Sequence, residues 1–153
     1  MLKNLLNYKF RILATLVLVF ALAIIRAYED FLFYDPFLNY FKSDYTNLPL
    51  PETERVCLFL NLLLRYSLNT AFSLLIIYVI FKKRELVVFA MLLYAIFFII
   101  LASGFFITLE FIGDENKMML FYIRRFLIQP IFLLLFIPAF YFQERASTKN
   151  NVS

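Results

Sequence analysis

The sequence lacks histidine altogether and contains one cysteine and two glycines among its 153 residues. Without histidine, His-based acid–base catalysis and the usual histidine metal sites are excluded. Cys57 cannot form an internal disulfide, and no histidine is present to activate it as a nucleophile. Gly104 and Gly113 alone cannot build a glycine-rich phosphate loop. We therefore predict a protein that is not an enzyme, with no catalytic residue, no metal site and no cofactor.

Hydrophobic residues dominate what is present. They make up 63% of the chain, and the mean hydropathy is +0.80, whereas soluble domains contain about 45–50% apolar residues. A chain of this size could not bury such an excess in one core. The apolar residues also fall in long blocks rather than along one stripe. These features predict an all-α membrane protein.

Four apolar segments predict a four-transmembrane-helix bundle that forms a single membrane domain over residues 1–145. The first segment is short for the roughly 20 residues that a crossing needs, and a cleaved signal peptide is its alternative. The sequence after it makes a poor cleavage site, which favours an uncleaved span. Prolines in the fourth segment predict a kink, and the polar tail 146–153 is predicted to be disordered. The predicted spans are 12–28, 56–81, 86–109 and 118–142.

Charged residues are unevenly distributed between the predicted spans. The N-terminal segment, the turn 82–85 and the tail are net positive, whereas the segment 29–55 holds six acids and two cations. The segment 110–117 likewise holds three acids and one cation. Since cations gather on the cytoplasmic side, both termini are predicted to be cytoplasmic. The net charge of +4 reflects this distribution and includes no basic face, so we expect no binding to nucleic acid.

The first outer loop contains an aromatic-rich segment. Asp35 and Pro36 predict a helix N-cap followed by proline at the first helical position. With its aromatic residues, the segment is expected to form a short interfacial helix resting at the membrane surface. An aromatic belt that anchors the bundle and a surface that docks a partner are both open interpretations. The candidate docking residues are Phe33, Tyr34, Phe37, Tyr40 and Phe41.

Four arginines are predicted at one depth, just within the outer leaflet. A cation in hydrocarbon costs about 2.5–3.5 kcal/mol even on the lenient insertion scale, so several at one level require compensating partners. Internal partners are available in the acids Glu29, Asp30, Glu110 and Asp114. The alternative is external, an anionic headgroup or a substrate carboxylate, which suits the guanidinium fork. The candidate partner or anion contacts are Arg26, Arg65, Asn69, Arg124, Arg125 and Gln129.

The second span carries a polar residue at every fourth position. The series is Asn61, Arg65, Asn69 and Ser73, which drifts about 120° around a helix. Because lipid would leave these groups unsatisfied, the stripe should face the bundle or a partner. Gln129 is expected to meet it across the interior. Interhelical hydrogen bonding is the favoured interpretation, and a functional surface is the alternative.

Several segments resemble one bacterial membrane protein family, the exosortase F system-associated proteins. They are Leu-Phe-Tyr-Asp-Pro over 32–36, Arg-Tyr-Ser-Leu-Asn-Thr over 65–70, Tyr-Ile-Arg-Arg-Phe-Leu-Ile-Gln-Pro over 122–130, and Ile-Pro-Ala-Phe-Tyr over 137–141. The resemblance covers most of the chain. It implies a multi-pass protein of the bacterial inner membrane, of the Bacteroidetes type, encoded beside a membrane-embedded exosortase.

The resemblance also implies a partner and a role. Exosortases are understood to cut and transfer proteins that bear a C-terminal sorting signal, using cysteine, arginine and histidine. Because this chain has no histidine, the resemblance implies an accessory protein that contacts an exosortase-like enzyme or its substrate at the outer face. Membrane lipids are the other expected partners. The alternative function is an anionic-lipid-binding membrane enzyme or small carrier that uses the outer-leaflet arginines.

Overall fold

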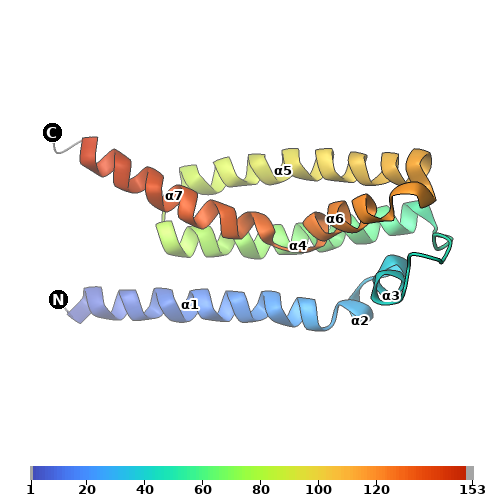
Figure 1. Cartoon of the computed structure of the whole chain (residues 1–153). Helices are drawn as coiled ribbons and strands as arrows, with labels where there is room; N and C mark the ends of the chain where they lie inside the picture. The colour runs from blue at the N-terminus through green and yellow to red at the C-terminus, as the bar shows by residue number, and fades with distance from the viewer. Residues whose placement is uncertain (1, 151–153) are drawn as a thin grey trace.

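The computed structural model describes the backbone of residues 2–150, and the side chains of residues 7–111 and 115–149. Figure 1 shows an elongated helical bundle, and no strand occurs over the described range. The elements are α1 (Leu2–Ala27), α2 (Glu29–Leu32), α3 (Pro36–Lys42), α4 (Arg55–Phe81), α5 (Arg84–Ile107), the π-helical turn η1 (Thr108–Ile112), the 3-10 turn η2 (Gly113–Asn116), α6 (Lys117–Ile128) and α7 (Ile131–Asn150).

The helices are those of a membrane protein. Within the described residues, three segments are long and apolar enough to cross a membrane, namely Asn7–Ala27, Arg55–Phe81 and Arg84–Phe111. The bent pair of α6 and α7 makes a fourth if it forms one span. Both termini lie at the same end of the bundle (Figure 1). We call this the terminal end, and the opposite end, which carries α2 and α3, the loop end.

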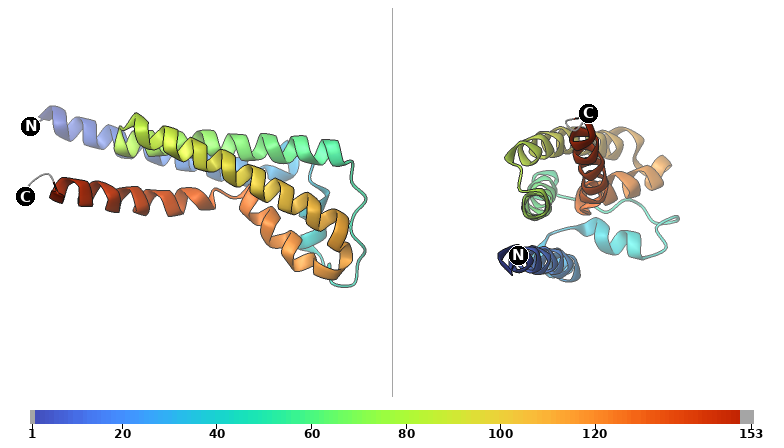
Figure 2. Two further views of the ribbon diagram at one scale, coloured as in Figure 1. Left: turned by 90° about the horizontal axis from the view of Figure 1, so that it is seen from above. Right: turned by 90° about the vertical axis from the view of Figure 1, so that its left-hand side faces the viewer.

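Helix α1 begins at Leu2, well before the predicted start of the first span at residue 12. Lysine, asparagine and leucine do not terminate a helix in water, so the basic segment continues the helix beyond its apolar part. In Figure 2, viewed from the terminal end, α1 lies beside α4 at the edge of the bundle. Helix α4 in turn packs against α5 and α6. Helix α4 is therefore the central element.

The kink predicted in the fourth span is a complete break. Helix α6 ends at Ile128, α7 begins at Ile131, and the two are bent by 59° (Figure 2). Gln129 between them is extended, with φ −108° and ψ 143°, because a following proline disfavours the helical conformation. The Nδ2 of Asn69 donates to the carbonyl oxygen of Ile128 at 2.9 Å. This bond satisfies a buried carbonyl that the break leaves without a helical partner.

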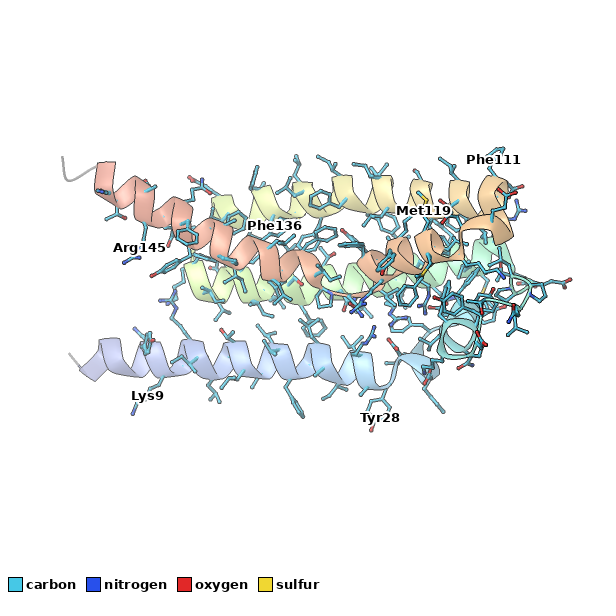
Figure 3. All side chains as sticks on the ribbon, in the orientation of Figure 1. Lys9, Tyr28, Phe111, Met119, Phe136 and Arg145 are labelled. Carbon is cyan, nitrogen blue, oxygen red and sulfur yellow. The ribbon has the colours of Figure 1, made fainter. Side chains whose placement is uncertain are left out.

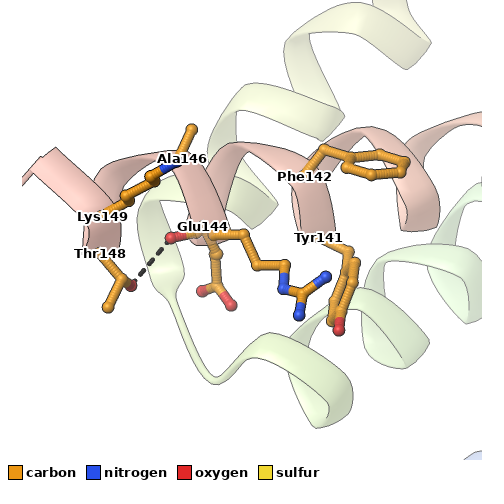
Figure 4. A pocket seen from close by; sticks show the side chains of 7 residues that line it. Tyr141, Phe142, Glu144, Ala146, Thr148 and Lys149 are labelled. Atoms are coloured by element: carbon orange, nitrogen blue, oxygen red, sulfur yellow. Dashed lines mark hydrogen bonds between the residues drawn. The ribbon is translucent and has the colours of Figure 1, made fainter.

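Helix α7 continues through most of the segment that the sequence predicted to be disordered, and it ends at Asn150. Glu144 pairs with Lys83 at 2.8 Å, which attaches this part of α7 to the turn between α4 and α5. The hydroxyl of Thr148 donates to the Glu144 carbonyl at 2.9 Å (Figure 4). The hollow of about 940 Å³ in Figure 4 is lined by α7 alone, so it is a groove along one helix. Residues 151–153 lie outside the described chain.

Aromatic side chains fill the space between the helices (Figure 3). Phe37 of α3 and Phe105 of α5 are fully buried and meet edge to face, with ring centroids 5.7 Å apart. Near the middle of the bundle, the Tyr66 hydroxyl donates to the Tyr94 carbonyl at 2.7 Å and joins α4 to α5. The α3 segment is therefore part of the packed core at the loop end.

We expect Asn69→Leu to destabilise the protein because the Ile128 carbonyl would lose its buried donor. The expected loss is about 0.6–1.7 kcal/mol, the range measured for interhelical hydrogen bonds in membranes. Reversible unfolding in mixed micelles measures it. Ser67→Ala, an exposed position on the same helix, is the matched control and should stay within about 0.5 kcal/mol. Equal stabilities of the two variants would contradict the role of Asn69.

Candidate functional site

Five ionised side chains from five elements meet inside the loop end of the bundle. We call them the charge cluster. They are Arg26 at the end of α1, Glu29 at the start of α2, Asp35 at the N-cap of α3, Arg65 of α4 and Arg124 of α6. Arg65 lies 16 residues before Phe81, or about 24 Å along the helix. The cluster therefore lies about 24 Å from the terminal end of α4, in the part of the helix nearer the loop end.

Each acid of the charge cluster serves two arginines. Glu29 accepts from Arg65 and lies 3.2 Å from Arg26. Asp35 accepts from the Nε of Arg124 at 3.0 Å and lies 3.5 Å from Arg65. The side chains of Glu29, Asp35, Arg65 and Arg124 are only 3–9% exposed, whereas that of Arg26 is 47% exposed. Four members of the cluster are therefore buried in the protein, and Arg26 is the member that is accessible from outside.

Local sequence chemistry explains how Asp35 reaches its position. Its Oδ1 accepts from the backbone N–H of Phe37 at 3.2 Å, and Pro36 occupies the first helical position, as the N-cap prediction required. Its Oδ2 remains available for the arginines. Aromatic rings cover the two buried guanidinium groups. The Cζ atom of Arg65 lies 5.4 Å from the centroid of the Phe33 ring, and that of Arg124 lies 5.9 Å from the centroid of the Phe41 ring. These distances are typical of cation–π contacts.

The charge cluster carries one excess positive charge. Its three guanidinium groups face two carboxylates. In a low-dielectric environment each ion needs a partner, because an uncompensated buried charge is strongly destabilising. The buried pairs therefore fix the relative positions of the helices, and the excess charge is presented at Arg26.

The structure shows internal pairing for three of the four predicted arginines. Of the acids considered as partners, Glu29 belongs to the cluster, whereas Asp30 pairs with Lys42 at 3.2 Å and Glu110 with Arg55 at 2.6 Å. The side chain of Asp114 lies outside the described residues. Sequence reasoning missed Asp35 as a partner because it was assigned only as an N-cap. Asp35 lies in the first outer loop, close to the depth predicted for the arginines, and this position could have identified it as a partner.

Arg125 does not join the cluster. It is exposed and donates from its Nε to the Oε1 of Gln129 at 3.2 Å. Consecutive residues of an α-helix point about 100° apart, so Arg124 faces the interior while Arg125 faces outward. The two arginines therefore lie at nearly the same level along α6 but on different faces of the helix, and only Arg124 belongs to the cluster.

The polar stripe of the second span faces the bundle, as predicted. Arg65, Asn69 and Ser73 are buried. The Oδ1 of Asn61 accepts from the backbone N–H of Tyr34 at 3.0 Å, which attaches the segment between α2 and α3 to α4. Asn69 supplies a hydrogen bond to α6 and Arg65 pairs with acids outside α4, in agreement with the interpretation that the sequence favoured.

The aromatic segment forms the short helix that the sequence predicted, α3, and most of its candidate docking residues pack against the bundle. Phe33, Phe37 and Tyr40 are buried and Phe41 is partly buried, whereas Tyr34 is 47% exposed. Helix α3 turns inward because its aromatic face packs on α5 and the Tyr40 hydroxyl donates to the Leu48 carbonyl at 2.9 Å. Phe33, Phe37 and Tyr40 are therefore packed core residues in this structure, and Tyr34 is the docking candidate that is exposed.

The candidate docking residues did not include Phe31, an aromatic residue two positions before Phe33. Phe31 on α2 is 95% exposed. The sequence pattern of a four-residue helix does not reveal which of its side chains face outward.

Arg11 has an unpredicted role at the terminal end. Its guanidinium donates to the carbonyl oxygens of Val79, at 3.0 Å, and Ile80 in the last turns of α4. Carbonyls at a helix C-terminus lack intrahelical donors and attract cations. Helix α1 is thus attached to α4 directly through Arg11 at the terminal end, and through Glu29, which pairs with both Arg26 and Arg65, at the loop end. No sequence spacing connects residues so far apart in the chain.

A lateral cleft of about 420 Å³ opens between α1, α4 and the broken span. Its polar lining residues near the loop end are Arg26, Arg65, Asn69 and Gln129. Its apolar walls include Val19 and Leu22 of α1, Ile76 of α4, and Leu133, Leu134 and Ile137 of α7. The structure therefore brings four of the predicted site residues together at one end of an intramembrane cleft.

No family model matches this chain, and neither does any curated protein or solved structure. Across the described residues, no group of three or more histidine, cysteine, aspartate or glutamate side chains is placed to hold a metal ion. The charge cluster, the exposed aromatic residues and the lateral cleft are therefore the features of this chain that bear on its function.

We expect Asp35→Asn to lower the free energy of unfolding by about 3–5 kcal/mol, because it leaves two buried arginines with one carboxylate. Asparagine is also a good N-cap, so the variant isolates the charge. Glu52→Gln, an exposed acid of the same loop, is the control and should have little effect.

The double variant Asp35→Asn/Arg124→Gln should recover part of the lost stability, because it restores the charge balance. A double-mutant cycle in mixed micelles measures this coupling. Additive effects would contradict the proposed pairing of Asp35 with Arg124.

Proposed function

We propose that the protein is a non-enzymatic accessory subunit of a membrane-embedded assembly, and that it binds its partner at the loop end. The observation that carries this proposal is the exposed corner formed by α2 and the start of α3. Phe31 is 95% exposed and Tyr34 is 47% exposed there, beside a hollow of about 420 Å³. Exposed aromatic residues are the side chains that most often anchor protein interfaces.

The corner is held in place by the charge cluster and its neighbours. Tyr34 is bonded to Asn61, Asp35 to Arg124, and Asp30 to Lys42. A surface that is already ordered loses less conformational entropy when a partner binds. The rigid attachment of so short a helix therefore supports a docking role.

The state of the charged residues supports an accessory role rather than a catalytic one. Arg65 and Arg124 are almost fully buried and are paired with Glu29 and Asp35. A catalytic group must reach the reacting atoms of its substrate. Cys57 contacts the Asn61 amide at 3.6 Å, and an amide does not generate a thiolate. The buried charged groups of the loop end therefore stabilise the packing of the helices.

For the partner we propose an exosortase-type sorting enzyme or its substrate, which the sequence resemblance suggests. The acidic loops at the loop end and the cations at the terminal end support an orientation with the loop end outside the inner membrane of a bacterium. The docking corner would then face the compartment in which sorted proteins are processed.

A photo-crosslinking amino acid at position 31 of the full-length chain tests this proposal in native membranes. We expect a covalent adduct with an exosortase-type enzyme or its substrate. Position 111 is the matched control, because Phe111 is 81% exposed at the same end and points away from the bundle (Figure 3). Adducts with lipid alone at position 31, or equal yields of protein adducts at positions 31 and 111, would contradict the docking proposal.

The orientation has its own test. In a Cys57→Ser background, Ser43→Cys should react with a membrane-impermeant maleimide in intact spheroplasts, whereas Ser147→Cys should react only after permeabilisation. Both serines are exposed, one near each end of the bundle. The opposite labelling pattern would reverse the proposed topology and remove the docking corner from the outer face.

A further inference from the structure

The lateral cleft is polar at one end and apolar along the rest of its length. Arg26 and Gln129 lie at the end nearer the charge cluster, while Thr15 lies at the other end. The Thr15 hydroxyl is already satisfied, because it donates to the carbonyl of Arg11 at 2.9 Å. A cleft of this kind inside a membrane suits a molecule with a polar head and an apolar tail.

The length of the cleft corresponds to one lipid leaflet. Arg26 and Thr15 are 11 residues apart on α1, or about 16 Å along the helix axis. The hydrocarbon core of a bilayer is about 30 Å thick, which leaves about 15 Å for the acyl chains of each leaflet. A single acyl chain can therefore extend through the cleft while its headgroup stays at the level of the charge cluster.

The charge at the head end favours an anion. Arg26 shares the Glu29 carboxylate with Arg65, and the cluster as a whole has one excess positive charge. The Arg26 guanidinium carries five N–H donors and is half exposed. Arg125 adds an exposed cation next to Gln129. A phosphate group accepts paired hydrogen bonds from such a guanidinium fork.

We propose that the lateral cleft binds an anionic phospholipid, with one acyl chain between α1 and α7 and the phosphate against Arg26. Gln129 lines the head end beside it, and Leu22, Leu134 and Ile137 contact the chain. This site is separate from the docking corner at Phe31, and the inference goes beyond the proposed accessory role. Discrimination against zwitterionic lipids comes from net charge, because the ammonium group of such lipids would return a positive charge to the cleft.

Native mass spectrometry of the full-length protein tests the site, with phosphatidylglycerol and phosphatidylethanolamine titrated separately in detergent. We expect one phosphatidylglycerol to bind with at least about tenfold preference over phosphatidylethanolamine, as one charge-assisted contact would give. Arg26→Gln should remove most of that preference, and Arg26→Lys should keep part of it. Ala23→Phe, which narrows the cleft at an exposed lining position, should weaken both lipids.

Matched controls separate the cleft from charge and hydrophobicity in general. Arg145→Gln removes an equal charge from α7 at the terminal end, and Ala139→Phe adds the same ring to an exposed position of α7 outside the cleft lining. Both should bind phosphatidylglycerol as the natural protein does. Circular dichroism of each variant confirms that the helices are intact.

Three results would overturn the proposal. The first is equal binding of the two lipids, and the second is unchanged phosphatidylglycerol binding in Arg26→Gln. The third is that Ala23→Phe leaves lipid binding intact but displaces a co-purifying membrane protein, which would assign the cleft to a partner helix. Phe31→Ala should leave lipid binding unchanged, so failure of the docking proposal and failure of the lipid site are distinguishable.

Discussion

A guanidinium group inside a helical membrane protein needs a counter-charge within hydrogen-bonding distance, because neither lipid tails nor apolar side chains can solvate it. Arg65 and Arg124 meet this requirement through Glu29 and Asp35. This requirement determines how the neighbouring elements are placed around the two arginines. Helix α2 places Glu29, the N-cap of α3 places Asp35, and the inward face of α6 carries Arg124. The two short helices are thus part of the charge compensation as well as a connection between spans.

The same constraint produces the lateral cleft. Helix α1 is held against α4 near both ends, by Arg11 on the last carbonyls of α4 and by Glu29, which pairs with Arg26 of α1 and Arg65 of α4. Pro130 prevents α6 and α7 from forming one straight helix that could pack along α1. The bend of 59° leaves apolar walls facing each other below the charge cluster. An opening at this depth is therefore a consequence of a fixed α1 and a broken span.

The proposed docking corner and the lateral cleft have no lining residue in common, and each includes members of the charge cluster. Buried pairs hold the loop end around the exposed Phe31, which in the proposed role would contact a protein partner, while Arg26 of the same cluster lines the cleft. A lipid bound there would occupy the groove next to the elements that hold the docking corner. In an accessory subunit, the two sites would combine recognition of a partner with recognition of the surrounding membrane.

The sequence by itself determined the helical membrane class, the N-cap at Asp35, the inward-facing polar stripe of α4 and the need of the arginines for partners. These properties are local, because they depend on hydrophobic length, helical period and single-residue chemistry. Only the tertiary structure decided which acids are the partners, that Phe37 and Tyr40 are core residues, and that Arg11 caps α4. Each of these depends on contacts between residues about 30 to 90 positions apart. The direction in which neighbouring elements approach sets such contacts, and a one-dimensional pattern of spacing contains no information on that direction.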